Sequence, residues 1–179
     1  MRSMKILVAY CSKTGTAEGI ARIVAEELGT AGSPADLRPL REVGDLSGYD
    51  TVVLGGPING MRPVPELAAF AAARCGDLQG KKTALFVVSY MYGRGRRMWS
   101  RAIGKSVQSL DAQLQPVPAE PAGGKERPEP AVFGGRIAAP MPGPARFIFG
   151  LPRDLPADLT DPDAVRAWSA RVAEYFNAR

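Results

Sequence analysis

The sequence predicts an α/β fold: a doubly wound parallel sheet of five strands with helices on both faces. Short apolar runs with strand character alternate with helical patterns five times along the chain of 179 residues. The runs are continuously apolar, which is typical of parallel strands buried on both faces. The length suits one domain with its own core, and we expect residues 1–179 to form a single domain.

The first strand and the first helix carry the clearest patterns. Residues 5–10 form an apolar run rich in β-favouring residues, which predicts a buried strand. Ile20, Val24 and Leu28 then recur every four residues, as on the inner face of a helix. Gly29 follows at the place where a left-handed C-terminal cap would end that helix.

The later elements are predicted from the same two patterns. Further short apolar runs predict strands at 35–40, 51–55, 81–89 and 131–133. Apolar residues at helical spacing predict helices at 64–73, at 99–114 and from 160–163 onward. Residues 115–130 hold five prolines and a Gly-Gly pair, and we expect a loop or mobile insertion there. Residues 140–156 are predicted to be irregular but partly apolar.

The loop between the first strand and the first helix has the composition of an anion site. A helix N-terminus presents unpaired N–H groups and the positive end of the helix dipole. Ser12, Thr14 and Thr16 add hydroxyl groups, and Gly15 allows the backbone to approach a ligand closely. The alternative is an ordinary strand–turn–helix connection whose hydroxyl residues only cap the helix. In a parallel sheet, the loops that begin at Cys11, Gly56 and Tyr90 should converge at one site.

Several classes of protein are excluded by absent motifs and residues. The chain has neither the G-x-x-x-x-G-K-[ST] loop of P-loop NTPases nor the G-x-G-x-x-G fingerprint of dinucleotide-binding folds. Histidine is absent, which excludes a His-ligated metal and a His-based catalytic triad. Cys11 and Cys75 are isolated, so we predict no metal site. No side chain stands out as a catalytic acid or base.

Charge and hydropathy limit which binding partners and which cellular compartment we expect. The formal net charge of +5 favours acidic substrates, phosphates or anionic lipid, whereas no nucleic-acid-binding motif is present. No apolar run approaches the ~20 residues of a membrane span. The first strand leaves no room for a signal peptide, and two isolated cysteines suit a reducing compartment, so we expect a cytoplasmic protein.

Four segments, taken in order, resemble the flavodoxin-like proteins. Residues 10–16 (YCSKTGT) look like the flavodoxin phosphate loop, and residues 53–60 (VLGGPING) look like the second flavin loop. Residues 131–137 and 161–168 look like the closing strand and helix of one branch, which contains menaquinone-dependent protoporphyrinogen oxidase. The resemblance spans nearly the whole chain and implies a flavodoxin-like fold with flavin mononucleotide (FMN) as cofactor.

The resemblance also implies which residues hold the flavin. The phosphate would be bound by Ser12, Lys13, Thr14, Gly15 and Thr16. The ring would be bordered by Pro57, Ile58, Asn59, Gly60, Tyr90, Met91, Tyr92 and Gly93. Tyr90 or Tyr92 would stack on the flavin face, the alternative being a partly buried loop aromatic. We interpret Cys11 as a small buried hydrophobe.

Three features depart from the family pattern, and one of them is the proline-rich insertion at 115–130. Ala17 occupies the last hydroxyl position of the phosphate loop, which removes one expected donor, and Thr16 stands one place earlier. Residues 140–156 are shorter than the corresponding segment of the oxidase branch, which is thought to touch the membrane. Phe147, Ile148 and Phe149 lie there and are expected in the core, in a homodimer contact or at a membrane interface.

A basic cluster follows the third loop. Arg94, Arg96 and Arg97 are candidates for binding a carboxylate- or phosphate-bearing substrate, with Arg101 and Lys105 nearby. The propionates of a porphyrinogen or the phosphates of NADPH would suit them, and the alternative is a solvated face.

Three functions therefore stay open. The first is an FMN-dependent oxidoreductase that passes electrons from a reduced substrate, such as a porphyrinogen, to an acceptor such as a quinone, in the cytoplasm or at the inner membrane face. The second is an electron carrier with a redox partner but no substrate of its own; such carriers are typically acidic. The third is an interaction domain without flavin. Flavin content separates the third from the others, and substrate turnover separates the first from the second.

Overall fold

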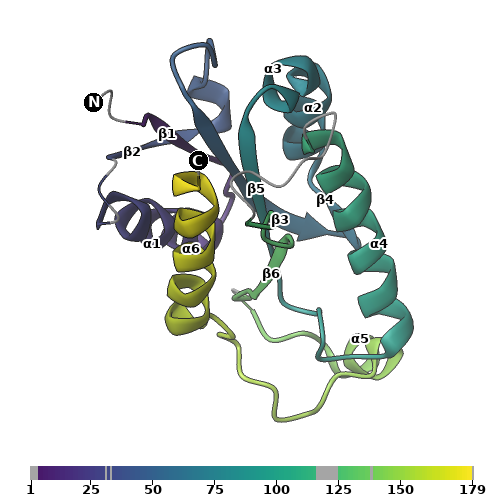
Figure 1. Ribbon diagram of the computed structural model, residues 1–179. Helices are drawn as coiled ribbons and strands as arrows, with labels where there is room; N and C mark the ends of the chain where they lie inside the picture. The colour runs from purple at the N-terminus through teal and green to yellow at the C-terminus, as the bar shows by residue number, and fades with distance from the viewer. Residues whose placement is uncertain (1–3, 31, 33, 116–124, 138, 179) are drawn as a thin grey trace.

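The computed structural model describes residues 4–30, 32, 34–115, 125–137 and 139–178, and its centre is a parallel sheet (Figure 1). In the described residues the strands are β1 (Ile6–Tyr10), β2 (Ala35–Pro39), β3 (Thr51–Asn59), β5 (Lys82–Ser89) and β6 (Ala131–Gly134), with a short β4 (Arg62–Pro63). The strand order is β2-β1-β3-β5-β6, all pairs being parallel, and β4 pairs antiparallel with the end of β3. The predicted doubly wound sheet of five parallel strands is confirmed, with the small strand β4 added to it.

Helices cover both faces of the sheet. One face carries α1 (Thr16–Thr30) and α6 (Pro162–Asn177), and the other carries α2 (Pro65–Ala73), α3 (Cys75–Gln79) and α4 (Arg97–Leu114) (Figure 1). A single 3₁₀ turn, Leu40–Glu42, follows β2. The short helix α5 (Gly143–Phe149) lies beyond the sheet, near the start of α4.

Alternate residues of the central strands divide the core into two clusters. Val8 and Phe86 face α1 and α6, whereas Leu54 and Leu85 face α2 and α4. The Phe86 ring packs edge-on against Trp168 of α6, with ring centroids 6.2 Å apart. Burial on both faces explains why the strand sequences are continuously apolar.

The structure corrects three local predictions. Helix α1 continues through Thr30 without a left-handed cap at Gly29. The run at 51–55 extends to Asn59, because β4 folds back on it as a hairpin. Within 140–156, α5 forms where an irregular segment was expected, because Phe149 packs on Trp99 with ring centroids 5.6 Å apart. The core interpretation is wrong for Phe147 and Ile148, which are 78% and 58% exposed.

Part of the proline-rich insertion is firmly packed. Residues 116–124 lie outside the described residues, but the side chain of Arg127 is only 14% exposed and lies against the sheet. Its guanidinium donates two hydrogen bonds to the Asp111 carboxylate, at 2.6 and 2.7 Å, and one to the Thr83 carbonyl at 2.9 Å. Residues 125–130 form neither a helix nor a strand, as expected of a loop, yet Arg127 anchors this part of the loop to the sheet and to α4.

Candidate functional site

A hollow of about 260 Å³ lies at the carboxyl ends of the strands, where parallel sheets bind ligands. It is formed by the segments that follow β1 and β6 and by the ends of β3 and β5. Its lining residues are Ser12, Lys13, Thr14, Thr16, Ala17, Pro57, Ile58, Asn59, Val64, Val88, Tyr90, Gly135, Arg136 and Ile137. The predicted convergence of the three loops is therefore observed.

The loop after β1 is shaped to receive an anion. The hydroxyl oxygen of Ser12 accepts a hydrogen bond from the N–H of Gly15 at 3.0 Å, and Gly15 adopts a left-handed φ of 83° that a glycine tolerates. Helix α1 begins at the next residue, so its N-terminal N–H groups point into the loop. Ala17 is buried in the core.

The hydroxyl oxygen of Thr16 is buried yet has no hydrogen-bond partner among the described residues. A buried hydroxyl without a partner is costly, and most such groups in proteins are satisfied by something. Thr16 lines the hollow at the start of α1, where the helix dipole favours an anion. A phosphate group there would accept the missing hydrogen bond, so the residues fit the phosphate of FMN.

A second hollow, of about 210 Å³, adjoins the first one. Gly15 and Thr16 line it from the loop after β1, and Asp158, Thr160 and Asp161 line it from the segment before α6. Thr16 and Arg136 line both hollows. The start of α1 therefore lies between them.

The hairpin of β3 and β4 forms one wall of the main hollow. Pro57, Ile58 and Asn59 line it, whereas Gly60 lies in the turn and is not among its lining residues. The turn has left-handed φ angles at Gly60 and at Met61, 56° and 65°. The Met61 carbonyl accepts a hydrogen bond from the Ser106 hydroxyl of α4 at 2.9 Å. This bond fixes a turn conformation that is uncommon for a methionine.

Gly55 and Gly56 come just before Pro57 in β3 and are closely packed against neighbouring side chains. A Cβ atom on Gly56 would stand 2.6 Å from the sulfur of Cys11, and one on Gly55 would enter the ring of Phe86. Cys11 is buried, in agreement with its interpretation as a small hydrophobe, and burial raises the pKa of its thiol to about 12. The thiol is therefore neutral at physiological pH and is no nucleophile.

The third loop is divided between two places. Tyr90 lines the main hollow, and its hydroxyl donates a hydrogen bond to the carbonyl of Pro156 at 2.7 Å. Met91 and Gly93 are not among the residues that line this hollow, and Tyr92 lines a different hollow on α4. Of the two predicted stacking residues, the structure thus brings only Tyr90 to the site.

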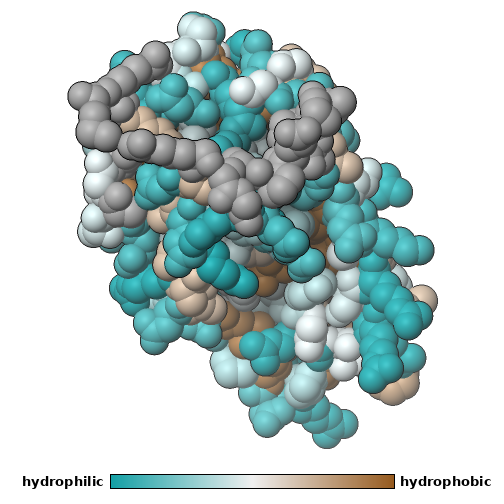
Figure 2. Space-filling view, viewed as in Figure 1, coloured by the Kyte–Doolittle hydropathy of each residue, from teal (hydrophilic) through white to brown (hydrophobic). Residues whose placement is uncertain are grey.

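The basic cluster lies beside the site rather than in it. Arg97, Arg101 and Lys105 follow one another along α4 and line an open hollow together with Tyr92. Figure 2 shows hydrophilic side chains along this outer side of α4. Arg94 and Arg96 are exposed in the preceding loop, where the backbone N–H of Arg96 donates to the carbonyl of Phe149.

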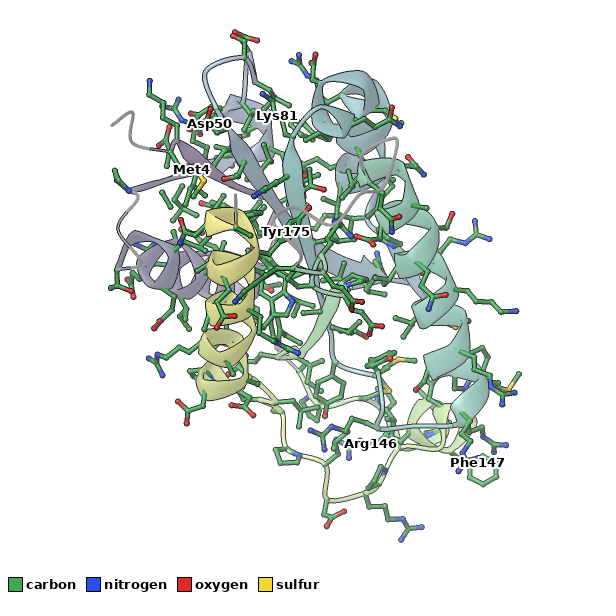
Figure 3. The ribbon with its side chains drawn as sticks, viewed as in Figure 1. Met4, Asp50, Lys81, Arg146, Phe147 and Tyr175 are labelled. Atoms are coloured by element: carbon green, nitrogen blue, oxygen red, sulfur yellow. The ribbon has the colours of Figure 1, made fainter. Side chains whose placement is uncertain are left out.

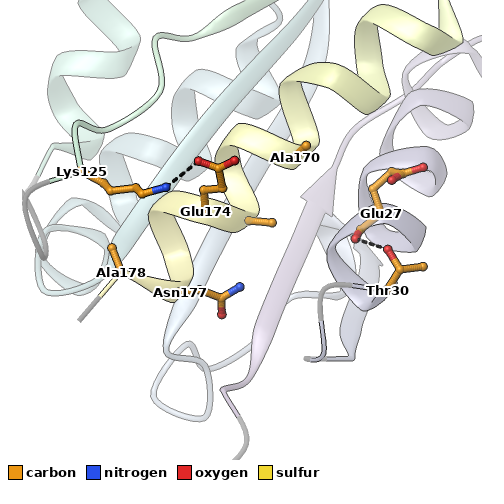
Figure 4. Close-up of a pocket in the computed structure, with 8 residues that line it drawn as sticks. Glu27, Thr30, Lys125, Ala170, Glu174, Asn177 and Ala178 are labelled. Atoms are coloured by element: carbon orange, nitrogen blue, oxygen red, sulfur yellow. Dashed lines mark hydrogen bonds and ion pairs between the residues drawn. The ribbon is translucent and has the colours of Figure 1, made fainter.

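A larger hollow, of about 560 Å³, shares no lining residue with the main hollow, and Figure 4 shows it in close-up. It is lined by the last turns of α1 and α6, and Lys125 forms an ion pair with Glu174 at its edge, at 2.6 Å. Its lining includes the carboxylates of Glu27 and Glu174 and none of the residues that follow the carboxyl ends of the strands. It is therefore not the candidate site.

Sequence reasoning missed part of the lining. Val64, Val88, Gly135, Arg136 and Ile137 border the main hollow without having been assigned to the site. The Gly134-Gly135 pair was a usable signal, because paired glycines after a strand often mark a close backbone approach. Among the described residues no cluster of potential metal ligands occurs, and no helix is long and apolar enough to span a membrane.

The comparisons with known proteins agree with this geometry. A profile described as "Flavodoxin domain" matches residues 7–140. Among curated proteins, none matches the chain. The rubredoxin:oxygen oxidoreductase from Desulfovibrio gigas is similar in structure, with a TM-score of 0.62 and 18% identity over 97% of this chain; the match spans only 36% of that protein.

Two flavodoxins are similar over nearly their whole length. Oxidised flavodoxin 1 from Bacillus cereus has a TM-score of 0.57 and 15% identity, covering 95% of this chain and 97% of its own. Two-electron-reduced flavodoxin from Megasphaera elsdenii has a TM-score of 0.55 and 16% identity, covering 94% and 98%. At such low identities the likeness establishes the fold.

Proposed function

The chain belongs to the flavodoxin domain family, whose cofactor is FMN, and we propose that it is an oxidoreductase using this flavin. Electrons would pass from a reduced, carboxylate-bearing substrate such as a porphyrinogen to an acceptor such as a quinone. The observation that carries the flavin site is the buried, unpartnered hydroxyl of Thr16 in the hollow at the strand ends.

The residues of the hollow would divide the binding of FMN among them. Ser12, Thr14 and Thr16 lie where the phosphate would bind, at the start of α1. Ile58 and Tyr90 offer apolar walls for the ring system. Bound FMN supplies the electron-transfer chemistry, so the chain needs no acid or base of its own.

The basic residues of α4 support a substrate that carries carboxylates. Arg97 and Arg101 are one helical turn apart and line the open hollow beside Tyr92. A guanidinium binds a carboxylate through two parallel hydrogen bonds, so two successive arginines match a substrate with two propionates.

The exposed apolar residues near α5 support peripheral contact with a membrane, where a quinone would be met. Met98 is 60% exposed, and Phe147 and Ile148 are more than half exposed. Figure 3 shows Phe147 pointing away from the protein. The exposed residues Arg94, Arg96 and Arg97 immediately precede Met98 in the sequence. Basic residues around an exposed apolar cluster favour binding to an anionic lipid surface. Homodimerisation through the same cluster is the alternative.

A second candidate function is electron transfer without a substrate of its own. The end-to-end match to two flavodoxins favours it, whereas the net charge of +5 favours the oxidoreductase. The third, a flavin-free interaction domain, is disfavoured by the orphan hydroxyl of Thr16.

An anaerobic turnover assay distinguishes the oxidoreductase from the electron carrier. FMN-loaded protein is mixed with a porphyrinogen and a soluble quinone, and the porphyrin formed is followed by its fluorescence. We expect porphyrin to form at a rate proportional to the protein, and more slowly in Arg97→Gln/Arg101→Gln. Absence of turnover by protein that nevertheless binds FMN would overturn the oxidoreductase in favour of a carrier.

A further inference from the structure

The side chain of Arg136 lies between the two hollows at the start of α1. It lines both of them, as Thr16 does. Arg136 comes from the segment after β6, so it faces the phosphate loop from the opposite side. Lys13 is the other cation that lines the main hollow, and it belongs to the loop itself.

The backbone that carries Arg136 is held on both sides. The N–H of Ile137 donates to the carbonyl of Ala157 at 3.0 Å, and the N–H of Leu159 donates to the carbonyl of Gly135 at 3.1 Å. A Cβ atom on Gly134 would stand 1.9 Å from the carbonyl oxygen of Leu159, so this close approach requires the glycine. These contacts fix the backbone at Arg136 next to the site.

The end of the side chain, in contrast, is weakly held. Its guanidinium lies 3.9 Å from the carboxylate of Asp158, and both side chains are about half exposed, 55% and 49%. Asp158 already accepts hydrogen bonds from the N–H and the hydroxyl of Thr160, at 2.9 and 2.7 Å. Exposed ion pairs at this distance contribute little, so Arg136 can leave Asp158 without a large loss.

We propose that Arg136 leaves Asp158 and binds the phosphate of the flavin, where it replaces the hydroxyl that Ala17 does not provide. This inference rests on the proposed function. A phosphate bound at the start of α1 would lie near the carboxylates of Asp158 and Asp161, which line the second hollow together with Thr16. A guanidinium placed between those carboxylates and the phosphate offsets their repulsion and donates hydrogen bonds to the phosphate oxygens.

The proposal makes Arg136 a determinant of selectivity for phosphorylated flavin. Riboflavin has the same ring system as FMN but no phosphate, so it would gain nothing from Arg136. The dissociation constants of both flavins, measured by quenching of flavin fluorescence at low salt, therefore isolate the contribution of this side chain.

Arg136→Gln is expected to weaken FMN binding about tenfold or more and to leave riboflavin binding unchanged. Arg136→Lys should restore most of the affinity, because the charge remains. Asp158→Asn should tighten FMN binding, because it removes the competing carboxylate. Arg153→Gln is the matched control: it removes an exposed arginine that follows α5 and lines neither hollow, and it should change neither constant.

Other outcomes overturn the proposal. If Arg136→Gln and Asp158→Asn weaken both flavins alike, the ion pair only supports the fold of the segment. If Arg136→Gln leaves FMN binding unchanged in a protein that binds FMN, Arg136 does not contact the phosphate, and the flavin site stands without it. If the unmodified protein binds neither flavin, the proposed function itself fails. Thermal unfolding of each variant without flavin identifies one that has lost its fold; if Arg136→Gln is that variant, Asp158→Asn, which should tighten the binding of FMN but not of riboflavin, carries the test.

Discussion

The guanidinium of Arg127 donates two hydrogen bonds to the carboxylate of Asp111, at 2.6 and 2.7 Å. Both side chains are largely buried, with 14% and 6% exposed. This pair ties the end of the proline-rich insertion to the last turns of α4. Its neighbour Thr83 extends the network, because its hydroxyl donates to the carbonyl of Leu114 at 2.7 Å.

Replacing Arg127 by methionine should lower the free energy of unfolding by about 3–5 kcal/mol, because it leaves a buried carboxylate without its partner. Urea denaturation followed by circular dichroism measures the loss. The double variant Arg127→Met/Asp111→Leu should recover most of it, since no unpaired charge remains. Lys125→Met, at the exposed pair with Glu174, is the control and should change nothing measurable. Equal effects at the two pairs would contradict the buried network.

Gly56→Ala should destabilise the protein by about 1–3 kcal/mol, because its methyl group would overlap the sulfur of Cys11. In the background of Cys11→Ala the same change should cost clearly less, since the sulfur is gone. The two changes are compared by a double-mutant cycle of unfolding free energies. Strict additivity would show that the two residues are not in contact.

The thiol of Cys11 should make stability fall at high pH. Burial raises its pKa from an ordinary value near 9.0 to about 12, so between these values the thiol ionises in the unfolded chain and stays protonated in the folded one. This contribution is fully present below pH 9 and is lost as the pH rises toward 12. In Cys11→Ala the decline over this window should be smaller. At pH 8 we expect a thiol reagent to label Cys11 only after denaturation, and rapid labelling of Cys11 in the native protein would contradict its burial.

The exposed side chains of Phe147 and Ile148 should determine whether the protein associates with membranes. Phe147→Ser/Ile148→Ser should reduce co-sedimentation with vesicles of an anionic phospholipid and leave the fold intact, because both side chains project into solvent. Neutral vesicles serve as the control and should bind weakly. If the double change leaves vesicle binding unaltered but shifts the molecular mass in solution, these side chains form a homodimer contact instead.

The strands of the sheet could be predicted because each one is encoded by a short run of neighbouring apolar residues. Residues 84–88 in the middle of β5 are apolar at every position, as burial on both faces of the sheet requires. The loop after β1, which lines the main hollow, could likewise be located from Ser12, Thr14 and Gly15. Both predictions needed only neighbouring residues.

The missed features depend on contacts between distant residues. Helix α5 is held by the ring of Phe149 on Trp99, and the insertion is held by Arg127 on Asp111. Tyr90 and Tyr92 look alike in sequence, but only Tyr90 is turned toward the site, where Pro156 accepts its hydrogen bond. Local patterns do not reveal such partners.

Titration with FMN tests the central claim, that Thr16 and its loop hold the flavin phosphate. The protein purified without added flavin, and its Thr16→Val variant, are each titrated with FMN and desalted. The flavin bands near ~370 and ~450 nm are then recorded. We predict that the unmodified protein retains these bands, whereas Thr16→Val binds FMN about tenfold more weakly without being less stable in the absence of flavin, because no hydrogen bond of the flavin-free protein is lost. Failure of the unmodified protein to bind FMN, or equal affinity of the two proteins, would contradict the claim.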